Sequence, residues 1–241
     1  MNKINPFYKM MESRWKKFYY PGQHLTIDEG IIPFQGRSKY KQYNPMKPQK
    51  WGIKIFMLTD SITKYTYSAK IYAGKQEKEK NYTTKLVLEL CKANFNKNHK
   101  LFIDNFYCSP LLARELEKVN IFTTGTVNRK RKSVPNFDFS NKDTEIFTSN
   151  NINICKFTDK KKTLLILSNC YHPQIDAVNN KPFTLNKYNE YMHAVDLVNQ
   201  AASFYRYRQR TLKWWKSVFV EILEITINNA YILYRKFGGE F

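Results

Sequence analysis

The sequence predicts an α/β protein in which helices cover a mixed β-sheet, and three observations lead to this fold class. Over the first half of the 241-residue chain, short apolar runs typical of buried strands alternate with segments of helical spacing. Two segments with helical spacing, 188–204 and 212–237, close the chain. Between these two parts, polar segments of 135–182 alternate with short β-like runs. Strands mixed with helices in this way are typical of a sheet flanked by helices.

The predicted strands are short apolar runs bounded by turn signals. Residues 1–22 form a basic, aromatic lead-in that ends at a Pro-Gly turn signal, and the first strand follows it. Residues 33–50 are rich in proline and basic side chains, which indicates an extended loop. A polar turn joins the second and third strands. The expected strands are 24–28, 51–58, 65–72, 101–104 and 121–124.

Two helices are predicted between these strands. Apolar residues recur on one helical face of 83–93. Ser109 has the chemistry of an N-cap and Pro110 suits the first helical position, so a second helix begins there. In the last predicted helix Glu221 and Glu224 interrupt the apolar face, which favours a core helix over a membrane helix.

The chain is strongly basic. Forty Lys and Arg residues against twenty Asp and Glu give a formal net charge of +20. Such an excess repels itself unless a polyanion is near, and DNA or RNA is the usual one, with an anionic membrane surface as the main competitor. No stretch reaches about 18 uninterrupted apolar residues, so we expect no membrane-spanning helix. The first residues lack the apolar core of a signal peptide, and we expect an intracellular protein, nuclear if its host has a nucleus.

The cysteines and histidines form no recognisable metal-binding pattern. No two cysteines have CxxC spacing, and each lies in or beside an apolar run. We therefore expect buried free thiols and no structural zinc. The four cysteines are Cys91, Cys108, Cys155 and Cys170.

Three aspartates from distant parts of the chain are the candidate site residues. Asp28 and Asp104 each end a short apolar run, and Asp196 lies in a segment with helical spacing. A carboxylate at the tip of a hydrophobic strand is costly unless it is paired or binds a cation. Asn199, three residues after Asp196, lies on the same helical face. Asp28 and Glu29 point to opposite faces of a strand, so only one of them joins a given site.

Carboxylates of this kind suit divalent metal ions that act on phosphodiesters. Mg²⁺ takes oxygen ligands, a few from carboxylates and the rest from water and phosphate. Two such ions can activate an attacking oxygen and stabilise a leaving one. For any one aspartate taken alone, a role in a turn, a cap or the surface is the simpler interpretation, and spacing by itself does not join the three.

A series of short motifs follows in order from about residue 18 to residue 235. They include Thr26-Ile27-Asp28-Glu29-Gly30, Pro33-Phe34-Gln35-Gly36-Arg37, Tyr43-Asn44-Pro45-Met46-Lys47-Pro48, Trp51-Gly52-Ile53-Lys54, Asp104-Asn105-Phe106-Tyr107, Gly125-Thr126-Val127, Val195-Asp196-Leu197, Trp214-Trp215 and Asn229-Ala230-Tyr231. Together they resemble the core of piggyBac-type transposases, and the resemblance covers nearly the whole chain.

The resemblance implies a ribonuclease H-like catalytic domain with a β-rich insertion before its last acidic helix. It implies cut-and-paste DNA transposition with Mg²⁺ or Mn²⁺, in which water attacks a phosphodiester and the freed 3′ hydroxyl attacks next. Asp28, Asp104 and Asp196 match the family's catalytic, metal-binding aspartates. We expect four parts: a lead-in, the first part of the core, the insertion, and the helices that complete the core. Their bounds are 1–22, 23–134, 135–182 and 183–241.

The chain also departs from the family pattern. Where the family commonly has another Asp three residues after the last catalytic one, this chain has Asn199, a weaker metal ligand without charge. His193-Ala194 replaces the usual Gly-Gly before that aspartate. The alternative is therefore a domesticated or decayed transposase-derived protein that binds DNA without catalysis. A third hypothesis, an RNA- or membrane-surface protein, rests on charge alone, and the sequence leaves a homodimer open.

Three basic clusters each follow one of the acidic motifs. Lys and Arg neutralise phosphates, which gives salt-dependent binding without sequence specificity. Double-stranded DNA is the expected partner. The residues predicted to contact it are Arg37, Lys47, Arg129, Arg131, Lys132, Arg206, Arg208 and Arg210.

Overall fold

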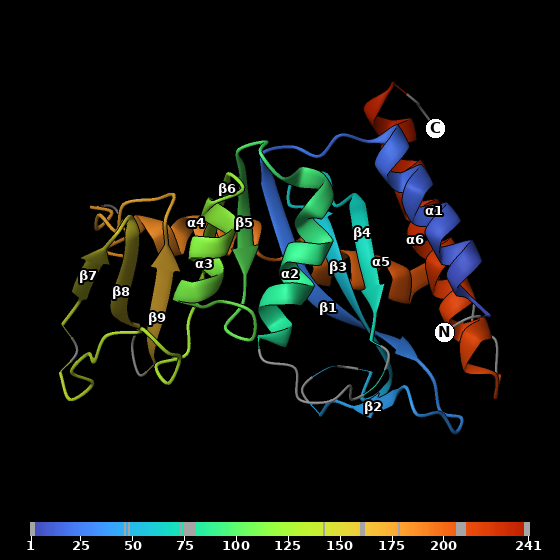
Figure 1. Ribbon diagram of the computed structural model, residues 1–241, viewed down its shortest axis with the longest axis horizontal. Coiled ribbons are helices and arrows are strands. Elements are labelled where there is room, and N and C mark those ends of the chain that lie inside the picture. Colours follow the sequence, from blue (N-terminus) through green and yellow to red (C-terminus); the bar gives the residue numbers. More distant parts are fainter. Residues whose placement is uncertain are drawn as a thin grey trace. The chain divides into compact units, whose positions relative to one another are not determined.

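The structure is a computed structural model, shown in Figure 1, and its chain forms two compact units. The first unit comprises Met1–Gly22, Ile27–Lys80 and Ala194–Phe241, and the second comprises Gln23–Thr26 and Asn81–His193. The residues that the structure describes are 3–45, 47, 49–72, 74, 81–141, 143–159, 162–177, 179–205 and 211–238.

The first unit is built on an antiparallel sheet around β3. Both β2 and β4 pair antiparallel with β3, and β1 is its other neighbour. Nearly every residue of β3 is buried, which explains its continuous apolar run. The strands are β1 (His24–Pro33), β2 (Lys41–Tyr43), β3 (Trp51–Asp60) and β4 (Thr66–Ile71).

Three helices cover this sheet: α1 (Asn5–Phe18), α5 (Ala194–Tyr205) and α6 (Trp214–Lys236). Helix α5 packs on β3, while α1 lies against β4 and α6, as Figure 1 shows. The lead-in predicted at 1–22 thus contains a helix. Its Trp15 is 2% exposed and donates its indole N–H to the Thr226 hydroxyl of α6 at 3.0 Å. This packing partner lies over 200 residues away, so local sequence pattern does not reveal it.

The second unit contains a mixed sheet. Strands β5 and β6 run parallel, and β6, β9, β8 and β7 follow as an antiparallel ladder. The residues 135–182, predicted to be rich in strands, therefore extend the sheet from the free edge of β6. The strands are β5 (His99–Ile103), β6 (Ile121–Thr126), β7 (Glu145–Ser149), β8 (Ile152–Asp159) and β9 (Lys162–Ser168).

Helices of the second unit pack against this sheet. Ser109 caps α3 by accepting the Leu112 N–H at 3.2 Å, and Pro110 is the first helical residue, as predicted. Helix α3 packs on β6, and α4 packs on β6 and β9. The helices are α2 (Tyr82–Cys91), the short 3-10 helix η1 (Lys92–Asn94), α3 (Pro110–Glu117) and α4 (Phe183–Tyr191). The mixed sheet flanked by helices confirms the predicted α/β class.

The single helix predicted at 188–204 is two helices. Helix α4 ends at Tyr191 and α5 begins at Ala194. The break coincides with the boundary between the two units, which falls between His193 and Ala194. Helix α4 packs on β6 and β9 of the second unit, and α5 packs on β3 of the first.

Other expectations concern the cysteines and membrane segments. Cys91, Cys108 and Cys155 are buried free thiols, as predicted, and Cys170 is half-buried. Among the described residues, no helix combines the length and the apolar character needed to cross a bilayer.

Asp60, the last residue of β3, joins the N-terminal segment to the β3–β4 turn. It is 1% exposed. One carboxylate oxygen accepts the Tyr19 hydroxyl at 2.9 Å and the Gly22 N–H at 2.7 Å. The other accepts the N–H groups of Ile62 and Thr63, each at 2.9 Å. Burial acts to raise the pKa of Asp60, but these hydrogen bonds outweigh it and hold the pKa below its usual value.

We expect Asp60→Asn to lower the free energy of unfolding by about 2–3 kcal/mol at neutral pH, since an amide cannot accept all four donors. The pKa of Asp60 is lower in the folded chain than in the unfolded chain. Its carboxylate therefore stabilises the fold at pH values above the unfolded pKa, and this stabilisation is lost as the pH falls from the unfolded pKa through the folded pKa. Urea unfolding at pH 7 and pH 3 measures both effects. Asp159→Asn, at an exposed ion pair with Lys181, is the control and changes little.

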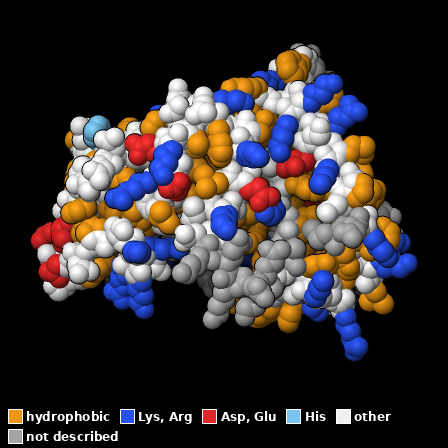
Figure 2. Space-filling view, in the orientation of Figure 1, with side chains coloured by type: hydrophobic (Ala, Val, Ile, Leu, Met, Phe, Trp, Pro, Cys, Tyr) orange, Lys and Arg blue, Asp and Glu red, His pale blue; other side chains and the backbone are white. Residues whose placement is uncertain are grey.

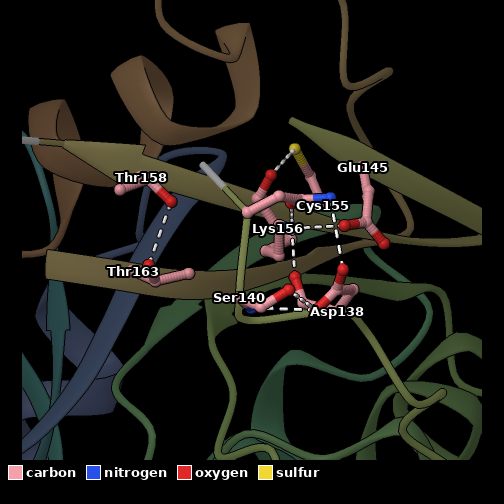
Figure 3. Close-up of polar contacts among 8 residues, drawn as sticks. Asp138, Ser140, Glu145, Cys155, Lys156, Thr158 and Thr163 are labelled. Atoms are coloured by element: carbon pink, nitrogen blue, oxygen red, sulfur yellow. Dashed lines mark hydrogen bonds and ion pairs between the residues drawn. The ribbon is translucent and has the colours of Figure 1, made fainter. Parts of the chain in front are cut away.

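A buried lysine organises the start of the β7–β9 ladder. Lys156 of β8 has a side chain that is 0% exposed. Figure 3 shows its ammonium directed at the Asp138 carbonyl, with Glu145 of β7 on another side. It also donates to the Asn141 side chain at 2.6 Å. Three acceptors match the three donors of an ammonium, so the polar segment before β7 is held onto β8.

We expect Lys156→Met to lower the free energy of unfolding by about 2–3 kcal/mol, because it leaves Glu145 and two further acceptors unpaired. The segment 138–145 should become sensitive to proteases at native conditions. Lys162→Met at the exposed start of β9 is the matched control. Equal stability and protease resistance of the two variants would contradict this role for Lys156.

Candidate functional site

Two of the three candidate aspartates converge within the first unit. Asp28 lies in β1 with a side chain 16% exposed, and Asp196 lies in the first turn of α5 with a side chain 52% exposed. The Lys47 Nζ lies 3.8 Å from Asp28 Oδ2 and 3.6 Å from Asp196 Oδ1. One positive charge therefore contacts two carboxylates that are 168 positions apart in the sequence.

The alternation of β1 directs Asp28 to one face of the sheet. The sequence predicted a strand that ends at Asp28, but the strand continues to Pro33, so Asp28 lies within it. The adjacent Glu29 pairs with a different lysine, Lys54, at 3.8 Å. Consecutive strand residues point to opposite faces, which explains the separate partners.

Gly30 leaves room for the Asn199 side chain of α5 against β1. A Cβ atom at this position would lie 2.6 Å from the Asn199 side-chain oxygen, closer than real contacts allow. Gly30 is two residues after Asp28 and shares its face of the strand. The Asn199 amide oxygen therefore lies on the same face of β1 as Asp28, and one helical turn from Asp196. Gly30 lies outside the strand predicted at 24–28, so its position inside β1, where glycine signals close approach, was not predicted.

The electrostatics of this cluster favour a bound cation. The pKa of Asp28 is raised to about 7, chiefly because the group is buried; Lys47 acts to lower this pKa, and the charges of Glu29 and Asp196 act to raise it. Burial acts to lower the pKa of Lys47, but the three carboxylates outweigh it and the pKa is raised. Carboxylates crowded in this way are stabilised by positive charge.

The third aspartate, Asp104, belongs to the second unit. It directly follows β5, whose last residue is Ile103. Its carboxylate accepts the Phe106 N–H at 3.0 Å, and its carbonyl accepts the N–H groups of Tyr107 and Cys108. The carboxyl end of a strand in an α/β sheet is where ligands commonly bind. Its meeting with Asp28 and Asp196 stays a prediction.

Arg131 braces the loop that follows Asp104. Its guanidinium donates to the Asn105 carbonyl at 3.2 Å and to the Phe106 carbonyl. These two residues and Arg131 line an open pocket of about 340 Å³ together with Asn128 and Lys130. Arg131, predicted as a DNA contact, is thus engaged in positioning the Asp104 loop.

The other predicted DNA contacts are mostly at the surface. Arg37, Arg129 and Lys132 are exposed, and the Arg129 guanidinium lies over the Phe139 ring at 5.5 Å. Arg206, Arg208 and Arg210 lie outside the described residues. Within the described part of the chain, no group of three or more His, Cys, Asp or Glu side chains is placed to hold a metal ion.

Comparison with known proteins gives a family and relatives. A family model described as "Transposase IS4" matches residues 1–231. The human "PiggyBac transposable element-derived protein 3" is 25% identical over 270 residues, which cover 98% of this chain and 44% of the relative. The human "PiggyBac transposable element-derived protein 2" is 21% identical over 261 residues, covering 97% and 44% respectively.

A solved structure is also similar. It is described as a cryo-EM structure of a piggyBac transposase synaptic complex with hairpin DNA. The TM-score is 0.90 at 27% sequence identity, over 97% of this chain and 51% of that chain. The chain thus spans about half the length of that transposase, and less than half of the two human relatives.

Proposed function

The chain belongs to the transposase IS4 family, and from this premise we propose that it is the catalytic core of a piggyBac-type DNA transposase. Its fold is the ribonuclease H-like fold of the piggyBac transposase catalytic domain. The proposed reaction is hydrolysis of a DNA phosphodiester, which frees a 3′ hydroxyl, followed by attack of that hydroxyl on a second phosphodiester. Asp28, Asp104 and Asp196 are the proposed catalytic residues.

The observation that carries this proposal is the pair of carboxylates around the Lys47 ammonium. Asp28, Asp196 and the Asn199 amide offer oxygen atoms, the ligands that Mg²⁺ and Mn²⁺ take. The Lys47 ammonium near both carboxylates supports a cation at this place by its charge. These residues therefore fit a divalent ion, with Asp104 as the proposed third carboxylate. Such an ion, when bound, activates a water or hydroxyl and stabilises the leaving oxygen.

The residues of the chain have distinct parts in this proposal. Asp28 lies within β1 and its side chain is mostly buried, while the side chain of Asp196 is half exposed. Lys47 would leave the carboxylates when a divalent ion binds, and its ammonium would then be available to a DNA phosphate. Arg131 positions the Asp104 loop through its backbone carbonyls.

The charge of the surface supports double-stranded DNA as the partner. Figure 2 shows Lys and Arg side chains spread over the face in view, with few acidic groups between them. Exposed Arg37, Arg129 and Lys132 are proposed phosphate contacts, and Arg206, Arg208 and Arg210 remain proposed contacts from the sequence. A DNA complex of the similar transposase agrees with this partner. A nuclear location and a homodimer also remain proposals.

A transposase-derived protein that binds DNA without catalysis is the second candidate. Asn199 favours it, because the amide brings no charge to the carboxylate pair. The human relatives are named as proteins derived from a transposable element, which agrees with either candidate.

We expect Lys47→Gln to bind Mn²⁺ about three- to tenfold more tightly than the unsubstituted chain, because the competing ammonium is gone. Isothermal titration calorimetry measures this without any DNA. Lys54→Gln removes a comparable charge beside Glu29 and serves as the control. Equal Mn²⁺ affinity of both variants and the unsubstituted chain would contradict the assignment of Asp28 and Asp196 as ligands.

We expect Asp104→Ala to reduce Mg²⁺- or Mn²⁺-dependent nicking of DNA by at least about 100-fold. Loss of a residue that only supports a metal ligand typically costs about 10- to 100-fold, and loss of a ligand itself should cost more. Duplex binding should persist, because the basic surface is unchanged. Asp143→Ala, at an exposed position of the same unit, is the control for charge. An unchanged nicking rate in Asp104→Ala removes this residue from the mechanism. Binding without any nicking by the unsubstituted chain would favour the second candidate.

A further inference from the structure

An exposed pair of aromatic rings lies on the β2–β3 hairpin. Tyr43 is the register partner of Trp51, and their ring centroids are 4.7 Å apart. Tyr43 is 52% exposed and Trp51 is 46% exposed. The neighbouring residue on the same side of β3, Ile53, is 0% exposed. The apolar face of the sheet therefore continues outward into two large rings in contact with water.

Stabilisation of the hairpin alone does not account for this exposure. A cross-strand aromatic pair does stabilise two strands. Three other paired rings of the same unit, however, are buried. Tyr40, whose ring packs edge-on against Trp214, is 7% exposed, and the stacked Tyr19 and Tyr65 are 6% and 1% exposed. Large rings left open to solvent are typical of a binding surface.

The charges around the rings select a polyanion. The Lys41 Nζ lies 4.9 Å from the centroid of the Trp51 ring, and Lys39 and Lys50 are exposed nearby in the sequence. Between Glu29 and Asp60 the sequence has no acidic residue and six Lys or Arg residues. Lysines beside exposed aromatic rings are the combination that binds single-stranded nucleic acid, since phosphates pair with the cations and bases stack on the rings.

Paired bases would not use these rings. In a duplex each base is already stacked between its neighbours, so only the lysines would contribute, through phosphates. The faces of unpaired bases are open and gain from stacking on any aromatic surface.

The loop between the two rings connects them to the aspartates. The Asn44 N–H donates to the Lys50 carbonyl at 2.8 Å and closes the loop at its base, directly beside Tyr43 and Trp51. Lys47 in the same loop contacts both Asp28 and Asp196. The rings therefore lie at the base of the loop whose lysine reaches the candidate catalytic carboxylates.

We propose that Tyr43 and Trp51 form a stacking platform for unpaired DNA bases next to the Asp28–Asp196 site. The proposal rests on the proposed function insofar as it names DNA as the ligand. Strands that separate at the reacting phosphate would place an unpaired base on these rings, while Lys39, Lys41 and Lys50 pair with the flanking phosphates.

The platform is tested by binding, in buffer without divalent metal. The full chain is titrated with a short end-labelled oligothymidylate and with a blunt duplex of similar length, and fluorescence anisotropy is followed. We expect Trp51→Leu to weaken oligothymidylate binding by about tenfold, as for the loss of one stacked base. Duplex affinity should change by less than about twofold, because the phosphate contacts remain. Trp51→Phe keeps a ring and should retain most of the affinity.

The matched control is Tyr234→Leu, which removes a ring of similar exposure, 47%, from α6 and should change neither affinity. Equal losses toward both DNA forms, no loss toward either, or tighter binding of oligouridylate than of oligothymidylate would overturn the proposal. Should Trp51→Leu fail to fold, photocrosslinking of the unsubstituted chain to an iodouracil-containing oligonucleotide decides. Crosslinks at Tyr43 or Trp51 support the platform, and crosslinks only elsewhere contradict it.

The outcomes separate this proposal from the proposed function. A chain that binds oligothymidylate through Trp51 but never nicks DNA keeps the platform and loses the catalysis. A chain that nicks DNA while Trp51→Leu binds oligothymidylate normally loses the platform alone.

Discussion

The contact of Lys47 with both Asp28 and Asp196 is the interaction on which the candidate site depends. Asp28 lies in β1 and Asp196 in α5, and Gly30 leaves room for the Asn199 side chain of α5 against the strand. Lys47 then joins both carboxylates from the β2–β3 loop. A strand, a loop and a distant helix are thus linked through one shared positive charge.

Positive charge has two different uses in this chain. Some cations are committed to the fold: Lys156 is buried among three acceptors, and Arg131 braces the loop after Asp104. Others are exposed and suit phosphates, as Arg37 and Lys132 do. Lys47 belongs to neither group, because it neutralises two carboxylates of the candidate site whose charges would otherwise repel one another. A net charge of +20 alone does not reveal which cations belong to which group.

Much of the fold could be predicted from local patterns. Most strands follow apolar runs, although β2 lies within the segment 33–50 that was predicted as a loop. The Ser109-Pro110 signal marks the start of α3 because capping is a local interaction. Helix α1 could not be predicted, since its Trp15 gains its partner from α6. The break between α4 and α5 was also missed, because the apolar spacing continues through it while the packing partners change. Lys156 gave no signal, as a lysine in a strand is usually exposed.

The sequence by itself determined the α/β class and most of the strands and helices, because apolar periodicity and caps are properties of neighbouring residues. Its ordered motifs also pointed to three aspartates, whose common role stays a prediction. Only the tertiary structure decided that Asp28 and Asp196 share Lys47, that Gly30 admits Asn199, and that Tyr43 and Trp51 face solvent together. The physical reason is that contacts between distant segments follow from how strands pair and helices pack. Local spacing does not record those choices.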